Sequence, residues 1–360
     1  MAKAKHIPGI ECDAPAADGI QLVLTGRLRE MCAFRKKALD WTDPEGVHDM
    51  RVASRRLRSA LRDFAPYLRK RQMKASLEEI KRIADALGEV RDEDVAILAL
   101  EKVMQRAPAQ FRDGIEELVQ LRRIKLDQSR KALVQLLRHR AIAKMQTDFS
   151  AALSEALKPS RRTRPNAGLA NSVSYRQIAR GTILNRLNEA ERLSNSLYRP
   201  LKATPLHKMR IAAKQLRYAL ELFDECWAPR LKPFAKKVAT LQTALGELHD
   251  CDVWIVDFGE RLASAQPRDL KSIPAVAGAS RNEAWLWLLS HFVRLRTRYF
   301  QEALMRWRQW EAQDSSKELC SIVDVGTAVT VATTGEATIA TTETHGTGEI
   351  PAADAADTRG

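Results

Sequence analysis

Two segments of the sequence place arginine and lysine at a spacing that could hold a phosphate-bearing ligand. The first segment starts at His48, and the second starts 159 residues later at His207. Because residues three and four apart share one face of a helix, the basic side chains of each segment form a column. A guanidinium fork can bind two phosphate oxygens at once, so the chemistry would be anion binding. The first basic column is His48, Arg51, Arg55, Arg58 and Arg62, and the second basic column is His207, Arg210, Lys214 and Arg217.

The opposite side of each segment is apolar and repeats at the same interval. Met50, Leu57 and Phe64 return as Met, Leu and Phe 159 residues later. An alternative is that the cations only solvate the outer face of an amphipathic helix. Solvated faces usually mix charge signs, and like charges at these spacings cost about 0.2–0.5 kcal/mol per pair. Since the chain forms such a column twice, we interpret the columns as an anion site.

A second motif follows each column, because Leu87–Val95 returns as Leu245–Val253. Glycine is the usual residue just after a helix, so Gly88 and Gly246 predict that a helix ends there. The carboxylates four and six residues beyond each glycine are then expected to cap the next helix and to favour its dipole. They could also orient the arginine forks of the columns. These carboxylates are Asp92, Asp94, Asp250 and Asp252.

Apolar residues recur at helical spacing along most of the chain, and this pattern predicts an all-α fold. The two copies of both motifs predict two helical bundles built from an internal repeat. We expect helices near residues 20–40, 46–65, 71–88, 92–106, 109–128 and 130–157, and again near 172–198, 205–226, 231–246, 251–264 and 281–311. The expected parts are an N-terminal tail (1–19), a first repeat (20–157), a linker (158–171), a second repeat (172–311) and a disordered acidic tail (316–360).

The chain is strongly basic, with 59 Lys and Arg against 45 Asp and Glu and a net charge of +14. Residues 316–360 hold seven acidic and two basic residues, so residues 1–315 carry +19. Such a field attracts polyanions, among them nucleic acid, polyphosphate and anionic membranes. Further basic clusters could join the anion site, although their spacing does not select among them. They include Lys81, Arg82, Arg138, Arg140, Lys236, Arg294 and Arg298.

The cysteines and the N-terminal residues bear on the compartment. Five cysteines are widely spread and form no CxxC pair. This pattern indicates neither a disulfide framework nor a zinc knuckle, and it favours a reducing compartment. The first residues lack the apolar core of a signal peptide, and no segment approaches the roughly 20 apolar residues of a membrane helix. We therefore expect a cytoplasmic protein without a membrane span.

The run His-x-Met-Arg-x-x-x-(Arg/Lys)-x-Leu-Arg-x-x-Leu, followed by Leu-Gly-x-x-x-Asp-x-Asp-Val, occurs twice and resembles the CHAD family, the conserved histidine α-helical domain. The resemblance covers about residues 20–311. It implies two bundles related by a pseudo-twofold axis with a basic groove between them. It also implies binding of inorganic polyphosphate and association with polyphosphate granules. Glu221 stands where the first copy has Arg62, so the copies are not equivalent. The implied contacts are His48, Arg51, Arg55 and Arg58 with their equivalents His207, Arg210, Lys214 and Arg217.

Two other functions share these electrostatics. Single-stranded nucleic-acid binding is one, but the columns lack interleaved aromatic residues on which bases could stack. A metal-dependent phosphohydrolase is suggested by the pairs His48-Asp49 and His249-Asp250, but the other copy of the repeat keeps neither pair. There is no P-loop, and the neighbouring arginines would repel a divalent cation. We therefore expect a non-catalytic polyphosphate-binding protein with no cofactor and no metal.

Overall fold

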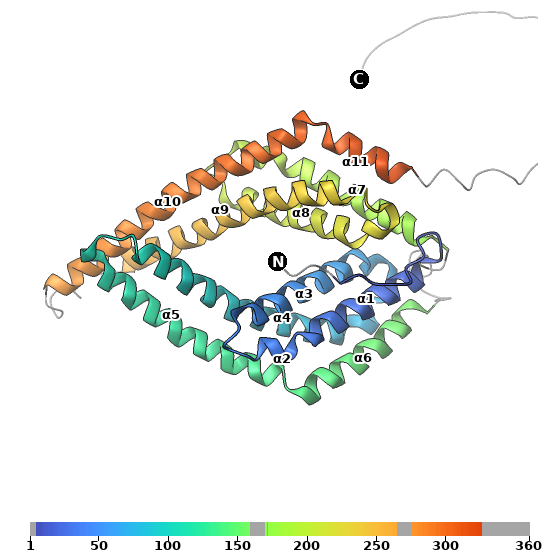
Figure 1. The fold of residues 1–360 in the computed structure, drawn as a ribbon, viewed down its shortest axis with the longest axis horizontal. Coiled ribbons are helices and arrows are strands. Elements are labelled where there is room, and N and C mark those ends of the chain that lie inside the picture. Colours follow the sequence, from blue (N-terminus) through green and yellow to red (C-terminus); the bar gives the residue numbers. More distant parts are fainter. Residues whose placement is uncertain (1–4, 159–169, 171, 265–274, 326–360) are drawn as a thin grey trace, which may run out of the picture. The chain divides into compact units, whose positions relative to one another are not determined.

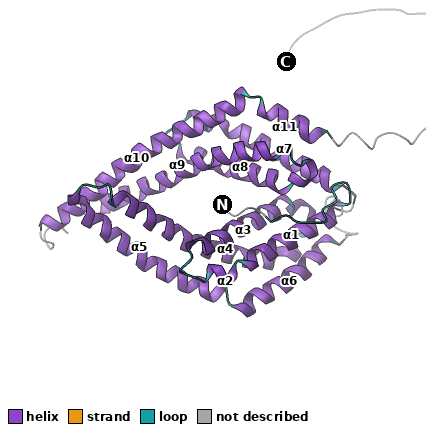
Figure 2. Cartoon of the chain, in the orientation of Figure 1, coloured by secondary structure: helices purple, strands orange, loops and turns teal. Residues whose placement is uncertain are grey.

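The regular elements of the protein are helices. The computed structural model describes residues 5–158, 170, 172–264 and 275–325, and every regular element there is an α-helix or a short 3-10 helix (Figures 1 and 2). The predicted all-α fold is confirmed. Each helix in these ranges is too short or too polar to cross a membrane. The helices of the first half are α1 (Ala16–Ala33), α2 (Arg35–Ala38), α3 (Pro44–Asp63), η1 (Ala65–Tyr67), α4 (Lys70–Met104), α5 (Ala109–Leu136) and α6 (His139–Leu157). Those of the second half are α7 (Tyr175–Leu193), η3 (Ser194–Tyr198), α8 (Ala203–Leu222), η4 (Asp224–Trp227), α9 (Lys232–Ser264), α10 (Ala275–Ala312) and α11 (Ser315–Asp324).

One hydrophobic core extends through both halves. α3 packs on α1 and α4, whereas α8 packs on α7 and α9. The halves meet where α3 contacts α8 and where α5 contacts α10 (Figure 1). At the first of these contacts the ring centroid of Phe223 lies 5.8 Å from that of Phe64 and 5.5 Å from that of Tyr175. Because all three rings are fully buried, the two helices that carry the basic columns are held together by the core. The pseudo-twofold axis stays a prediction.

The long helices α4 and α9 are not interrupted at Gly88 and Gly246, so the predicted helix ends there are wrong. A glycine inside a helix costs only about 1 kcal/mol relative to alanine. The fully buried Leu87 and Val90 flank Gly88 closely, and burying such side chains outweighs that cost. It follows that Asp92 and Asp250 do not cap a helix. Asp92 lies inside α4, and Asp250 lies inside α9.

The ends of the predicted parts also shift. α1 begins at Ala16, inside the expected tail of residues 1–19. The expected acidic tail from residue 316 starts instead with most of α11, which buries three apolar side chains at helical spacing. The remainder of that tail, beyond residue 325, lies outside the described residues. The expected linker (158–171) lies outside them too, apart from its first residue and residue 170.

A disulfide joins the N-terminal segment to the second half. Cys12 and Cys226 are bonded, with their Cα atoms 5.5 Å apart. Asp13 accepts hydrogen bonds of 2.7 and 3.0 Å from the guanidinium of Arg176, and this ion pair holds the same segment. The expectation that the cysteines form no disulfide was therefore wrong for this pair. The two residues are 214 positions apart, and such a pairing leaves no local pattern in the sequence.

Candidate anion-binding site

The basic columns lie on α3 and α8, one of the helix pairs through which the halves meet. Asp43 caps the start of α3, because its carboxylate accepts a hydrogen bond of 3.0 Å from the backbone N–H of Glu45. On the apolar side, Met50, Leu57 and Phe64 are fully buried, and their equivalents on α8 are buried as well. Most of the cations lie on the other side and are partly exposed. The division into a core face and a cationic face is as the spacing predicts.

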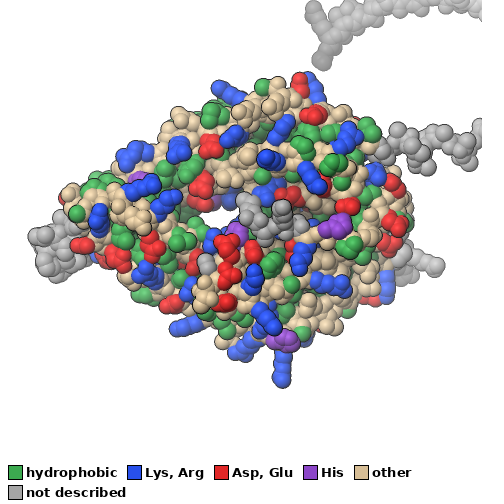
Figure 3. Space-filling model, viewed as in Figure 1, with side chains coloured by type: hydrophobic (Ala, Val, Ile, Leu, Met, Phe, Trp, Pro, Cys, Tyr) green, Lys and Arg blue, Asp and Glu red, His purple; other side chains and the backbone are tan. Residues whose placement is uncertain are grey.

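The cations of α8 lie within electrostatic reach of those of α3. Burial and the charges of Arg210, Arg55, Arg62 and Arg58 lower the pKa of Lys214 to about 8. Three of these four arginines belong to α3, so the columns face one common space. Figure 3 shows an opening at the centre of the face that it draws. Charge repulsion across such a space is relieved when an anion enters it.

Carboxylates on α4 hold two arginines of the first basic column. Arg51 Nη2 lies 2.7 Å from Asp92 Oδ1, and Arg58 Nη1 lies 3.6 Å from Asp85 Oδ1. Asp92 is thus paired with Arg51, and its role in orienting that guanidinium fork stays a prediction. These exposed pairs add little stability, and they place each of the two guanidinium groups beside a carboxylate in the free protein.

The other three predicted carboxylates have different surroundings. Asp94 lies 3.5 Å from Arg130 of α5, and Asp252 lies 2.5 Å from Arg296 of α10. These pairs link α4 to α5 and α9 to α10. No cation lies within ion-pair distance of Asp250 among the described residues, and removal from water raises the pKa of its carboxyl group. Asp94 and Asp252 therefore serve the packing of the helices, outside the columns.

Four cations of the columns have no carboxylate within ion-pair distance in the described part of the chain. They are Arg55, Arg62, Arg210 and Lys214, and the Nε of Arg210 is also buried without a hydrogen-bond partner there. Arg217 differs, since it is buried and lies 2.7 Å from Glu221. The acid that replaces a base in the second column thus neutralises Arg217. The cations best placed for a ligand are the four without carboxylates.

The two column histidines differ in their surroundings. His207 Nδ1 lies 3.2 Å from the Nδ1 of His249 on α9. Burial, with the charges of Arg210 and His207, lowers the pKa of His249 to about 4. Burial also lowers the pKa values of His48 and His207 below the ordinary value, and nearby arginines add to the effect. All three imidazoles are therefore mostly uncharged at neutral pH, and a bound anion would favour their protonation.

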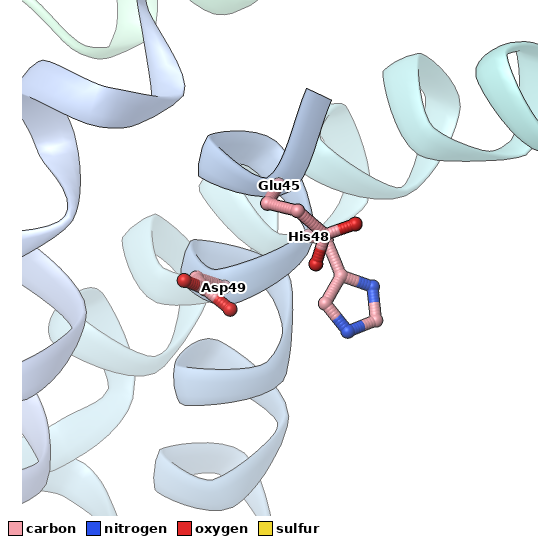
Figure 4. Close-up of side chains that lie close together, drawn as sticks. All are labelled: Glu45, His48 and Asp49. Atoms are coloured by element: carbon pink, nitrogen blue, oxygen red, sulfur yellow. The ribbon is translucent and has the colours of Figure 1, made fainter. Parts of the chain in front are cut away.

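One turn of α3 gathers three potential metal ligands. Glu45, His48 and Asp49 each offer an atom, and these atoms lie within 4.8 Å of one another (Figure 4). Carboxylate and imidazole groups are common ligands of first-row divalent metals. The second copy has Thr204 and Lys208 in place of the two acids, so it lacks this set. The set is the structural basis of the phosphohydrolase alternative.

The additional basic residues named from the sequence are scattered. Lys81 lies one turn before Asp85 on α4, so it shares the side of that helix that faces α3. Lys236 lines a separate cavity of about 390 Å³ among α8, α9 and α10. The others are exposed, with Arg82 on α4, Arg138 and Arg140 at the start of α6, and Arg294 and Arg298 on α10.

Asp85 is the functional residue that the sequence analysis missed. Asp85 and Asp92 are seven residues apart, which places them on one side of a continuous helix. The predicted helix end at Gly88 hid this relation. The buried Leu87 and Val90, which continue the apolar series through the glycine, were the signal that could have shown it.

Sequence comparison places the chain in a family. The model of the CHAD domain matches residues 22–256, more than half of the chain. The chain belongs to the CHAD domain family. The resemblance drawn from the repeated motifs is confirmed. The match ends within α9, whereas the resemblance was expected to reach about residue 311 and so to include most of α10.

Two solved structures share the fold of this CHAD domain. The crystal structure of the CHAD domain from the plant Ricinus communis is 22% identical, with a TM-score of 0.62, and the alignment covers 84% of this chain and 96% of that one. PptA from Streptomyces chartreusis is 13% identical, with a TM-score of 0.57, and the alignment covers 82% of this chain and 100% of that one. At these identities the likeness concerns the fold. No curated protein sequence matches the chain.

Anion binding by this CHAD domain should depend on pH through Lys214. Its pKa of about 8 in the free protein leaves it partly uncharged in alkaline solution. A bound polyanion favours the charged ammonium, so binding raises this pKa and takes up a proton. Affinity for a polyanion should therefore increase as the pH falls from about 10 to about 8. Titration calorimetry in buffers of different ionisation enthalpy would measure the proton uptake.

The matched control is Lys214→Arg, which keeps the positive charge but does not titrate in this range. This variant should bind the polyanion and lose the alkaline pH dependence. An unchanged dependence in Lys214→Arg would assign the proton uptake to another group.

Proposed function

We propose that this CHAD domain binds inorganic polyphosphate without catalysis at its two basic columns and associates with polyphosphate granules. The observation that supports the proposal is the shared space between α3 and α8, where the charges of both columns lower the pKa of Lys214 to about 8. Arg55, Arg210 and Lys214 lack carboxylate partners in the described part, so their charges are available to phosphate oxygens. The repeated CHAD motifs imply the same ligand.

Burial of the neighbouring rings favours polyphosphate over single-stranded nucleic acid. Phe64, Tyr175 and Phe223 lie where α3 meets α8, and none of the three has exposed surface. Proteins that bind single strands without sequence preference stack bases on exposed aromatic rings, which contributes about 1–3 kcal/mol per base. A phosphate chain has no base to stack and needs only the cations.

A competition experiment tests the proposal. Labelled long-chain polyphosphate bound to the protein is challenged with unlabelled polyphosphate or with single-stranded RNA at matched phosphate concentration. RNA should need a concentration at least about tenfold higher to displace the label, equivalent to about 1.4 kcal/mol. Equal or better displacement by RNA would support the nucleic-acid alternative instead.

The absence of catalysis is part of the proposal and has its own test. Purified protein should release no phosphate from long-chain polyphosphate in the presence of Mg²⁺ or Mn²⁺. Glu45, His48 and Asp49 form the set that could hold a metal for such a reaction. Steady phosphate release that Glu45→Gln or Asp49→Asn abolishes would establish a phosphohydrolase and reject the non-catalytic proposal.

A further inference from the structure

Each basic column contains one cation that faces a glycine on the neighbouring helix. In the first half, the two ion pairs between α3 and α4 show that these helices are antiparallel. Arg55 lies four residues after one of the paired arginines and three residues before the other. Gly88 stands correspondingly between the two paired aspartates, Asp85 and Asp92. Arg55 is therefore the cation of the first column that has no side chain opposite it on α4.

The second half repeats this arrangement. At one end, Arg217 Nη1 lies 3.5 Å from Gln242 Oε1. At the other end, the charge of Asp250 acts on the arginine one turn before Lys214. Lys214 and Gly246 occupy the positions between these two pairs of residues. A column cation without a carboxylate partner and a glycine thus face each other in both copies of the repeat.

Neither helix geometry nor packing accounts for the two glycines. Gly88 lies inside the 35 residues of α4, and Gly246 lies inside the 33 residues of α9. Among the described glycines a positive φ occurs at Gly9. Gly88 and Gly246 have the φ of a helix, which suits any residue other than proline. A Cβ atom at either position would meet no atom within 4 Å. Alanine would thus fit, and it would favour each helix by about 1 kcal/mol.

We propose that Gly88 and Gly246 keep open a passage in which an unbranched phosphate chain reaches Arg55 and Lys214. The inference rests on the proposed function and adds a determinant of affinity to it. Its basis is steric. A longer side chain at either glycine occupies the open space from which phosphate oxygens approach the cations that lack a carboxylate partner.

The test is the double variant Gly88→Leu with Gly246→Leu, compared with the wild type for binding of long-chain polyphosphate by titration calorimetry. The net charge is unchanged, and leucine favours a helix more than glycine, so Tm should hold or rise. Affinity should fall about 10- to 100-fold, the loss that follows when one charge-assisted contact is prevented. The smaller pair Gly88→Ala with Gly246→Ala should show a lesser loss of affinity together with a higher Tm.

A matched control lies on α7. Gly181 is partly exposed inside a helix, and a Cβ atom there would also meet nothing within 4 Å. Gly181→Leu therefore makes the same chemical change at a helix that carries no column residue. This variant should bind polyphosphate as the wild type does. A loss equal to that of the double leucine variant would overturn the inference.

Two further results would overturn the inference. The first is a folded double leucine variant that binds polyphosphate as tightly as the wild type. The second applies if circular dichroism shows that the double leucine variant does not fold. In that case, unchanged affinity of the double alanine variant at a raised Tm would overturn the inference. In both cases the wild type still binds, so the proposed function stands and the role of the glycines alone is rejected. A wild type that does not bind polyphosphate would reject the proposed function itself.

Discussion

Replacing four cations of the columns with glutamine should lower the affinity for long-chain polyphosphate by several orders of magnitude and leave the fold intact. The variant combines Arg51→Gln, Arg55→Gln, Arg210→Gln and Lys214→Gln. Each lost charge-assisted contact with a phosphate should cost about 1.5–3 kcal/mol of binding free energy. Removing like charges relieves repulsions of a few tenths of a kcal/mol each, which offsets the loss of the exposed pair between Arg51 and Asp92. Calorimetry would give the affinity, and thermal unfolding would show an unchanged or slightly higher Tm.

The control removes the same net charge outside the columns. Replacing four exposed lysines by glutamine should lower affinity only modestly. These lysines are Lys36, Lys37, Lys102 and Lys131. Salt dependence adds a second readout. Six to ten contacts predict a log–log slope of roughly −4 to −7, and the column variant should flatten it by about 3, since each contact adds about 0.7. Equal losses in both variants would show that bulk charge carries the binding.

Breaking the disulfide between Cys12 and Cys226 should lower the free energy of unfolding by up to about 5 kcal/mol, the loop-entropy estimate for a ring of this size. The bridge joins residues that are 214 positions apart, so it chiefly restricts the unfolded chain. The folded segment should stay in place after reduction, because Arg176 still holds Asp13 by two hydrogen bonds. Calorimetry with and without dithiothreitol should show Tm falling on the order of 10 °C.

The matched variant is Cys12→Ser with Cys226→Ser. Its Tm should be low in both buffers and equal to that of the reduced wild type. Dithiothreitol acts on disulfides and leaves free thiols unchanged, so the reductant reports on the bridge. Burial raises the pKa values of Cys32 and Cys251 to about 12, so these thiols exchange little with the bridge at neutral pH. A wild type with the same Tm in both buffers would contradict the prediction.

The features that depend on local spacing could be predicted from the sequence. Met50, Leu57 and Phe64 are buried, and the arginines of α3 lie on the other side, because both sets follow from 100° per residue. The repeat of that spacing 159 residues later predicted the same faces for α8. The pairing of Arg51 with Asp92 was also within reach, since both residues belong to the two motifs that recur in order.

The remaining errors concern contacts between distant segments. The helix end predicted at Gly88 rested on a local preference of about 1 kcal/mol. Packing of the buried side chains around the glycine overrides that preference. The predicted helix end also hid Asp85. The pairing of His207 with His249 and the disulfide from Cys12 depend on how helices pack, and no periodicity in one segment reports it. α11 is short enough that its own sequence would barely hold it as a helix without the core.

Because α4 is continuous, affinity for a polyanion should depend on the length of the polyanion. Arg51 and Arg58 are seven residues apart on α3, which at 1.5 Å per residue is about 10.5 Å. Aspartates of one 35-residue helix hold both guanidinium groups, so this interval exists before any ligand arrives. A chain shorter than the interval touches one fork at a time. A longer chain can bridge both guanidinium groups, and the second contact then forms within the complex without a second entropy cost of association. Affinity should therefore rise in a step once the ligand reaches that length.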